Sequence, residues 1–184
     1  MPNVLIPLAQ GCEELEAVTV IDLLRRAGIG VVSAGLTEGP VRGSRGTVLL
    51  PDATLDEILH QEFDMIVLPG GQPGSNNLDA DPRIHALLTR MASAGKYTCA
   101  ICAAPLVLAN AGLLHGKRAT SFPGVLDKMN LPDVELRTDA VVKDGKVITS
   151  RGPGTAMDFA LMLIEELAGK VKRDEVEAGL VRKE

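Results

Sequence analysis

Cys102 is the residue of this 184-residue chain whose surroundings most favour nucleophilic chemistry. It follows a short apolar run, residues 97–101, that predicts a buried strand, and a helix-forming run, residues 103–114, comes next. Backbone N–H groups and the helix dipole stabilise negative charge at a strand-to-helix junction. Because the thiolate is the reactive form of cysteine, this position predicts a nucleophile with a lowered pKa. A buried and inert thiol is the alternative reading.

A glycine-rich turn supplies the backbone groups that such a nucleophile needs. The apolar run 65–68 predicts a second buried strand, and Gly70, Gly71 and Gly74 follow it. Glycine lets the backbone approach a reacting atom closely, and N–H groups in the turn can form an oxyanion hole. A plain turn at the end of a strand would have the same composition.

Three glutamates, Glu13, Glu14 and Glu16, follow the first expected strand and open a helix. One acid at that position is explained by the positive end of the helix dipole, but three within four residues exceed that need. One of them can face inward at the carboxyl end of the strand, where parallel sheets carry their active sites. A carboxyl group buried beside a thiolate has a raised pKa and can stay protonated as a hydrogen-bond donor.

The expected elements alternate between strand and helix along the chain. Strands are predicted at residues 4–8, 29–34, 65–68 and 97–101, and helices at 13–27, 55–61, 81–94, 103–114, 155–168 and 174–181. Two hairpins are predicted within 41–50 and 140–150, the second around Asp144-Gly145. This order predicts an α/β fold with a mostly parallel sheet and helices on both faces, in a single domain over residues 1–184.

These segments together resemble the ThiJ/PfpI (DJ-one-like) superfamily over roughly residues 3–180. The matching pieces include Gly11-Cys-Glu-Glu-Leu-Glu16, Ser44-Arg45, Val67-Leu-Pro-Gly-Gly71, Ala100-Ile-Cys-Ala103 and Thr149-Ser-Arg-Gly-Pro-Gly-Thr155. The resemblance implies a flavodoxin-like three-layer sandwich in which the nucleophile stands on a strand-to-helix elbow. It also implies a homodimer and chemistry that needs neither a metal nor an organic cofactor.

The resemblance assigns roles to residues of this chain one by one. Cys102 matches the nucleophile, and Glu16 matches the glutamate that hydrogen-bonds it. Gly71 and Ala103 match the backbone donors of the oxyanion hole, with Gly70 beside them.

Three arginines match positions at the rim of the family's site. Arg45 and Arg26 match an anion-friendly pocket next to the subunit contact, although surface ion pairs explain each of them at least equally well. Arg151 precedes the last long helix, where an anion site at the helix N-terminus is one reading and a structural loop is the favoured one. Its matching position in the family lies near the subunit contact and the active-site rim. The chain departs from many members at Phe122, where they carry a histidine. A Cys–His dyad is therefore not expected, and Glu16 is left as the main acid–base group.

The other two cysteines are expected to be unlike each other. Cys99 lies inside the predicted strand and is expected to be a buried structural thiol, although it forms a C-x-x-C pair with Cys102. Cys12 lies in the loop after the first strand and is expected to be exposed to oxidants. The three cysteines lack the spacing of a zinc site or of a disulfide framework, which favours the cytoplasm.

Composition narrows the class of partner. The net charge is −5, and the chain has no Trp, one Tyr and no basic stripe, so no dedicated nucleic-acid site is expected. No apolar run approaches the ~20 residues of a membrane span, and no signal peptide is apparent.

Two functional hypotheses follow from these residues and the resemblance. The first is a cofactor-free cysteine enzyme, like deglycases and glyoxalases, that acts on α-oxoaldehydes such as methylglyoxal or on their early adducts with protein or nucleotide. The second is a sensor of oxidative stress or a redox-regulated chaperone that works through oxidation of Cys102 with little turnover. A peptidase is less favoured, because Phe122 stands where that branch carries its histidine.

Overall fold

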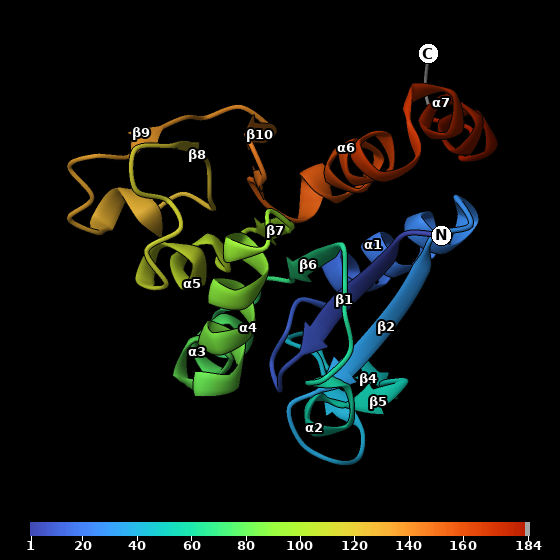
Figure 1. Cartoon of the computed structure of the whole chain (residues 1–184), viewed down its shortest axis with the longest axis horizontal. Coiled ribbons are helices and arrows are strands. Elements are labelled where there is room, and N and C mark those ends of the chain that lie inside the picture. The colour runs from blue at the N-terminus through green and yellow to red at the C-terminus, as the bar shows by residue number, and fades with distance from the viewer. Residues whose placement is uncertain (183–184) are drawn as a thin grey trace.

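Seven strands form the central sheet of the computed structural model, which describes residues 1–182 (Figure 1). The strand order is β10-β11-β7-β6-β1-β2-β5, and every neighbouring pair is parallel except the hairpin β10–β11. The strands of this sheet are β1 (Asn3–Leu8), β2 (Gly30–Gly35), β5 (Ala53–Thr54), β6 (Met65–Leu68), β7 (Tyr97–Ile101), β10 (Val141–Asp144) and β11 (Val147–Ser150). Two short pairs lie outside it: antiparallel β3 (Val41–Arg42) with β4 (Val48–Leu49), and parallel β8 (Arg118–Ala119) with β9 (Glu135–Leu136).

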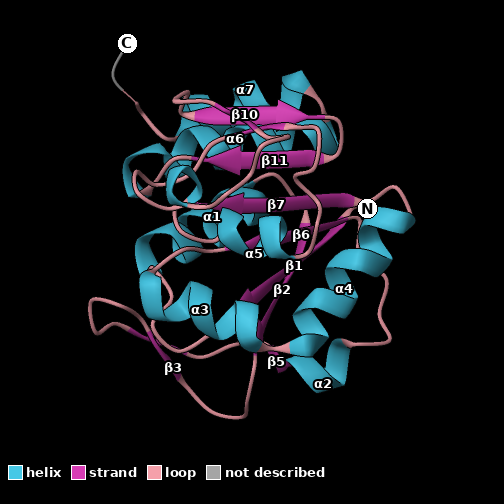
Figure 2. Ribbon diagram, turned by 90° about the vertical axis from the view of Figure 1, so that its left-hand side faces the viewer, coloured by secondary structure: helices cyan, strands magenta, loops and turns pink. Residues whose placement is uncertain are grey.

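Helices cover both faces of the sheet, as Figure 2 shows. One face carries α1 (Glu14–Arg26) and α6 (Ala156–Ala168), with α7 (Lys170–Gly179) packed on α6. The other face carries α2 (Leu55–Ile58), α3 (Gln72–Ala80), α4 (Pro82–Ser93) and α5 (Pro105–Asn110). Two 3-10 turns, η1 (Leu126–Lys128) and η2 (Pro153–Thr155), complete the described elements.

Alternation along the strands builds the two cores. Ile6 of β1 and Ile101 of β7 pack with α1 and α6, whereas Leu5 and Ala100, one residue earlier in each strand, pack toward the opposite helices. This arrangement follows from the two-residue period of a strand. The predicted three-layer α/β sandwich with a mostly parallel sheet is confirmed.

Several element boundaries differ from the expectation. Helix α3 was not predicted, because its sequence carries Pro73 and Gly74 in the first turn and reads as part of the glycine-rich turn. The helix after the elbow is shorter than expected, since α5 ends at Asn110 and Gly112 takes a positive φ of 75°. Both predicted hairpins are confirmed by the antiparallel pairs β3–β4 and β10–β11.

The order of the strands reverses at β1. The chain runs from β1 to β2 and β5 on one side, and returns on the other side of β1 through β6, β7 and β11. Ligands of such sheets bind beyond the carboxyl ends of the strands at this switch point. The elbow after β7, the glycine turn after β6 and the loop after β1 all lie at that edge.

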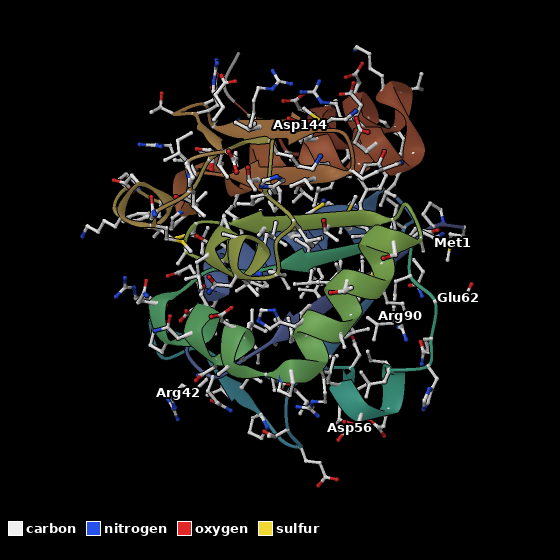
Figure 3. All side chains as sticks on the ribbon, turned by 60° about the vertical axis from the view of Figure 1, so that its left-hand side comes forward. Met1, Arg42, Asp56, Glu62, Arg90 and Asp144 are labelled. Atoms are coloured by element: carbon white, nitrogen blue, oxygen red, sulfur yellow. The ribbon has the colours of Figure 1, made fainter. Side chains whose placement is uncertain are left out.

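The edges of the molecule are also visible in the side-chain view. Arg42 on β3 and Asp144 on β10 lie toward opposite ends of the molecule in this view (Figure 3).

Among residues 1–182, no helix combines the length and the apolar composition that a membrane crossing requires.

Candidate active site

Cys102 stands on a strained backbone turn directly after β7. Its φ is 63°, in the left-handed region that non-glycine residues seldom occupy. Its N–H donates to the carbonyl of Ser150 at 2.9 Å, and its own carbonyl accepts from the N–H of Phe122 at 2.8 Å. Such strain costs on the order of 1–3 kcal/mol and persists only where the surroundings hold it. Hydrogen bonds from both sides hold this elbow.

Glu16 enters the same site from the first turn of α1. It is fully buried, and its Oε2 accepts the N–H of Gly70 at 2.8 Å. Its Oε1 is buried and has no hydrogen-bond partner among the described residues. A Cβ added to Gly70 would lie 2.6 Å from the Cβ of Cys102 and 2.6 Å from Oε2 of Glu16. Gly70 is therefore required by the close approach of the cysteine and the glutamate.

Burial decides the proton affinity of Glu16. Loss of solvent raises its pKa to about 7, and the charge of Glu13 adds to the rise, while the N–H of Gly70 and the thiol of Cys102 oppose it. A carboxyl group with this pKa holds its proton below neutral pH and exchanges it near pH 7. Proton transfer is most efficient at such a value.

The lowered pKa expected for Cys102 is wrong in this structure. Burial, followed by the charge of ionised Glu16, raises the pKa of the thiol to about 12, although the N–H groups of Gly71 and Ala103 lower it. Cys102 is only 8% exposed, and helix α5 starts three residues later, at Pro105. A proton on Glu16 removes the repulsion that its charge exerts on the thiolate.

Gly71 brings a backbone N–H to the thiol because of its unusual conformation. It has a φ of 90° and caps the start of α3. A Cβ on Gly71 would lie 2.5 Å from the nitrogen of Glu13 and 2.5 Å from the oxygen of Gly11. The carbonyl of Gly70 in turn accepts the N–H of Glu13 at 2.8 Å. The turn after β6 and the loop after β1 are thereby locked together.

A cavity of about 330 Å³ opens over the thiol. Its lining comes from loops at the carboxyl edge of the sheet: Glu13, Ser44, Arg45, Gly71, Gln72, Pro73, Cys102, Ala103, Phe122 and Pro153. The size suits a small molecule or one modified side chain. Gln72 and Pro73 were not singled out as site residues, because nothing in their residue types marks them for chemistry.

Glu14 fastens the loop that carries Ser44 and Arg45. Its carboxylate accepts the N–H of Arg45 at 2.9 Å, the N–H of Thr47 at 3.1 Å and the hydroxyl of Ser44 at 3.2 Å. Burial alone would raise the pKa of Glu14. These donors, together with its own N–H, outweigh it and lower that pKa to about 2. Glu14 is therefore a permanent anion that holds one wall of the cavity.

The three predicted arginines lie in different places. Arg45 lines the cavity, and its Nε is 4.0 Å from Oε2 of Glu13, with a side chain that is 80% exposed. Arg151 does not line this cavity but a second one, which shares Phe122 with it, and its Nη1 donates to the carbonyl of Ser121 at 3.4 Å. Arg26 pairs with Asp22 at 2.6 Å near the other end of α1. At ~1.5 Å per residue, it is about 15 Å from Glu16 along the helix axis, so the structure does not bring it to this cavity.

The two remaining thiols are both fully buried. For Cys99 this confirms the expectation, and burial raises its pKa. For Cys12 the expected exposure is wrong, because the start of α3 packs over it: a Cβ on Gly74 would lie 2.6 Å from the Cα of Cys12. Burial, then the charge of Glu14, raises the pKa of Cys12 to about 11. This thiol is protected rather than poised for oxidation.

Residues 2–166 match the model of the DJ-1/PfpI family, and the chain belongs to this family. It is similar to the protein dj-1beta of Drosophila melanogaster, at 47% identity over 97% of this chain and 96% of the relative. The crystal structure of Drosophila DJ-1beta superposes with a TM-score of 0.94 at 46% identity, covering 100% of this chain and 99% of that one.

Two further relatives span nearly the whole chain. The Parkinson disease protein 7 homolog of Danio rerio is 42% identical over 98% of this chain and 97% of its own length. The protein named glutathione-independent glyoxalase DJR-1.2 of Caenorhabditis elegans is 38% identical over 92% of this chain and 89% of its own length.

Proposed function

We propose that this protein is a cofactor-independent cysteine enzyme that converts α-oxoaldehydes such as methylglyoxal into 2-hydroxy acids. The observation that carries the proposal is the buried pair of Cys102 and Glu16, in which the pKa of the carboxyl group is about 7. The nematode relative, whose name states a glyoxalase activity without glutathione, supports it. An internal cysteine takes the place of the thiol that glutathione would otherwise supply.

The first step is addition of the thiol to the aldehyde. The Sγ of Cys102 bonds to the aldehyde carbon while the thiol proton passes to ionised Glu16. The N–H groups of Gly71 and Ala103, which already point at the sulfur, stabilise the oxyanion that forms. Glu16 returns the proton to that oxygen, which gives a hemithioacetal and an ionised carboxylate again.

The second step moves a hydrogen within the adduct. Glu16 removes the proton from the former aldehyde carbon to give an enediolate. It then delivers that proton to the neighbouring carbon, while the hydroxyl proton of the adduct moves to the former ketone oxygen. The aldehyde carbon is thereby oxidised to a thioester, and the ketone carbon is reduced to an alcohol. Water hydrolyses the thioester, releasing the 2-hydroxy acid and the free thiol. No external oxidant or reductant is consumed.

The same residues serve early adducts of the aldehyde with protein or nucleotide. There the sulfur displaces the amine or thiol from the carbinol carbon, and Glu16 protonates the leaving group. The resulting hemithioacetal is identical to the one formed from free aldehyde. The amine or thiol is released unmodified.

The test follows methylglyoxal loss and lactate formation with wild type, Cys102→Ser and Cys12→Ser in parallel. We expect many turnovers with wild type and with Cys12→Ser, and none above background with Cys102→Ser. An absence of turnover in wild type, together with rapid oxidation of Cys102 by peroxide, would overturn the enzyme and favour the redox sensor.

We also propose that the protein is a homodimer of the cytoplasm. Exposed apolar side chains on neighbouring helices support the dimer: Leu15 and Val18 on α1 and Met157 on α6 are 50%, 45% and 43% exposed. Three free cysteines support a reducing compartment. Light scattering at micromolar concentration would contradict the dimer if the mass were that of one 19.4 kDa chain.

A further inference from the structure

A second cavity, of about 150 Å³, adjoins the one over Cys102. Phe122 lines both cavities. The second cavity is also lined by Thr120, Asp127, Arg137 and Arg151. The proposed chemistry at Cys102 uses none of these four side chains.

Arg151 has unused capacity for hydrogen bonding. It is half-buried, and among the described residues no carboxylate lies within 4.0 Å of its guanidinium. Within residues 1–182 the one hydrogen bond of its guanidinium is the long contact from Nη1 to the carbonyl of Ser121 at 3.4 Å, and its backbone N–H donates to the carbonyl of Ala140 at 3.1 Å. A guanidinium carries five N–H donors, so most of those on Arg151 face no acceptor of the protein.

Thr120 adds a second unsatisfied polar group on the same cavity. The residue is only 1% exposed, and its Oγ1 has no hydrogen-bond partner within residues 1–182. Its N–H, by contrast, donates to Oγ1 of Thr149 at 2.9 Å. A buried hydroxyl without a partner is costly, which favours a site completed by a ligand or by ordered water.

One cation on the cavity has no carboxylate partner among the described residues. Arg137 pairs with Glu135 at 2.9 Å and Asp139 at 3.1 Å, so its charge is balanced. Asp127 is a negative group on the lining, and its Oδ1 is occupied by the N–H of Gly124 at 2.7 Å. Arg151 is therefore the cation on this lining that no carboxylate of the described residues pairs with.

Phe122 contacts residues beside both cavities. Its N–H holds the carbonyl of Cys102, while its ring packs on Gly152, where an added Cβ would lie 3.3 Å from the ring. Phe122 is 47% exposed, so a substrate that reaches both cavities would lie against its ring.

We propose that this cavity is an anion subsite, in which Arg151 binds a carboxylate or phosphate group carried by the carbonyl substrate. The inference rests on the proposed function, because it places the reacting carbon of that substrate at Cys102. A guanidinium binds such groups through paired hydrogen bonds. The cavity, of about 150 Å³, has room for several water molecules at ~30 Å³ each. A carboxylate or phosphate group therefore fits in it. The site therefore prefers anionic α-oxoaldehydes to neutral ones.

The test compares 4,5-dioxopentanoate, an α-oxoaldehyde with a carboxylate tail, with its neutral methyl ester. For wild type we expect a kcat/KM about tenfold higher for the acid than for the ester, through KM, as one charged hydrogen-bonding pair provides. In Arg151→Gln this preference is lost, and Arg151→Lys restores part of it. Inorganic phosphate competes with the acid in wild type if phosphate also fits, and does not compete if the cavity accepts only carboxylate.

Arg90→Gln is the matched control for the loss of one positive charge. Arg90 lies on α4 (labelled in Figure 3), is exposed, and donates to the carbonyl of Leu59 at 2.8 Å, with no carboxylate partner among the described residues. The preference for the acid stays unchanged in this variant. Equal kcat/KM for acid and ester in wild type, or a preference that survives in Arg151→Gln, would overturn the subsite while leaving the carbonyl enzyme intact.

If wild type turns over neither the ester nor methylglyoxal, the proposed function fails instead. The subsite is then tested by binding alone. Amide NMR shifts of the protein are followed while 4,5-dioxopentanoate or inorganic phosphate is titrated in. Saturable shifts at residues 120–122 and 151 that vanish in Arg151→Gln would support it. No shift there with either anion would overturn it.

Discussion

Glu14 and Glu16 lie two residues apart at the start of α1, and both are withdrawn from solvent, yet their pKa values move in opposite directions. The pKa of Glu14 falls to about 2, and that of Glu16 rises to about 7. The difference lies in the donors. Glu14 gathers the hydroxyl of Ser44 and the N–H groups of Arg45 and Thr47, whereas Glu16 receives one backbone N–H, from Gly70.

Burial by itself therefore does not determine what a carboxyl group does. With several donors the anion is stable and fastens the loop 43–47. With a single backbone donor and a thiol, the neutral acid becomes competitive near pH 7, and the group can carry a proton to and from Cys102. One helical turn thus presents a structural anion on one side and a proton carrier on the other.

The largest expected effect is on turnover, in Glu16→Gln. The amide keeps an acceptor for Gly70 but cannot carry a proton, so kcat for methylglyoxal falls by at least about 100-fold. Stopped or continuous assays of lactate formation measure this kcat. Glu175→Gln on α7 is the control for a Glu-to-Gln change. Wild-type turnover in Glu16→Gln would show that another group moves the proton.

The same variant changes the pH dependence of stability. Glu16 ionises near pH 4.3 in the unfolded chain and near pH 7 in the folded one, so the folded state holds an extra proton between these values. Its contribution is therefore present below about pH 4 and is lost as pH rises toward 7, by roughly 3.5 kcal/mol in total. Urea unfolding at pH 5 and pH 8 should show this fall in wild type but not in Glu16→Gln. Parallel curves would contradict the raised pKa.

Gly70→Ala tests how closely Cys102 and Glu16 approach. The added methyl group would lie 2.6 Å from atoms of both side chains and must push them apart. We expect a loss of about 2 kcal/mol in the free energy of unfolding, as in other overpacked sites, together with loss of turnover. Gly179→Ala, where an added Cβ meets nothing within 4 Å, is the control. An unaffected Gly70→Ala would mean that the pair is more loosely packed than the structure has it.

Glu14→Gln should have the smallest effect of the four. The amide retains one acceptor but loses the charge that strengthens the bonds from Ser44, Arg45 and Thr47, at a cost of about 1.5 kcal/mol at pH 7. The contribution of Glu14 is present above about pH 4.3 and is lost as pH falls toward 2, opposite in sign to Glu16. Thermal unfolding at pH 7 and pH 3 should therefore separate the variant from wild type more at pH 7. A constant difference would contradict the lowered pKa.

Much of the fold is predictable from the types and spacing of neighbouring residues. The apolar runs of β1, β6 and β7 and the start of α4, where Asp81 accepts the N–H of Arg83 at 2.9 Å, are marked by residue type and spacing. Helix α3 was missed because Pro73 and Gly74 are residues of turns, and only packing against the loop after β1 makes that segment helical.

The alternation of strands and helices, the cysteine at a strand end and the acids at a helix start are predictable from the chain alone, because each is a property of neighbouring residues. Which acid is charged, which thiol is enclosed and which arginine lies near the site depend on the packing of distant segments. Glu14 and Glu16 differ through contacts more than 30 residues away, with Arg45 and with Gly70. Cys12 is buried by α3. Arg26 lies far from the cavity because it is at the opposite end of α1 from Glu16. The pKa of a side chain depends on how much water and how many donors surround it, and those are fixed only when distant segments meet.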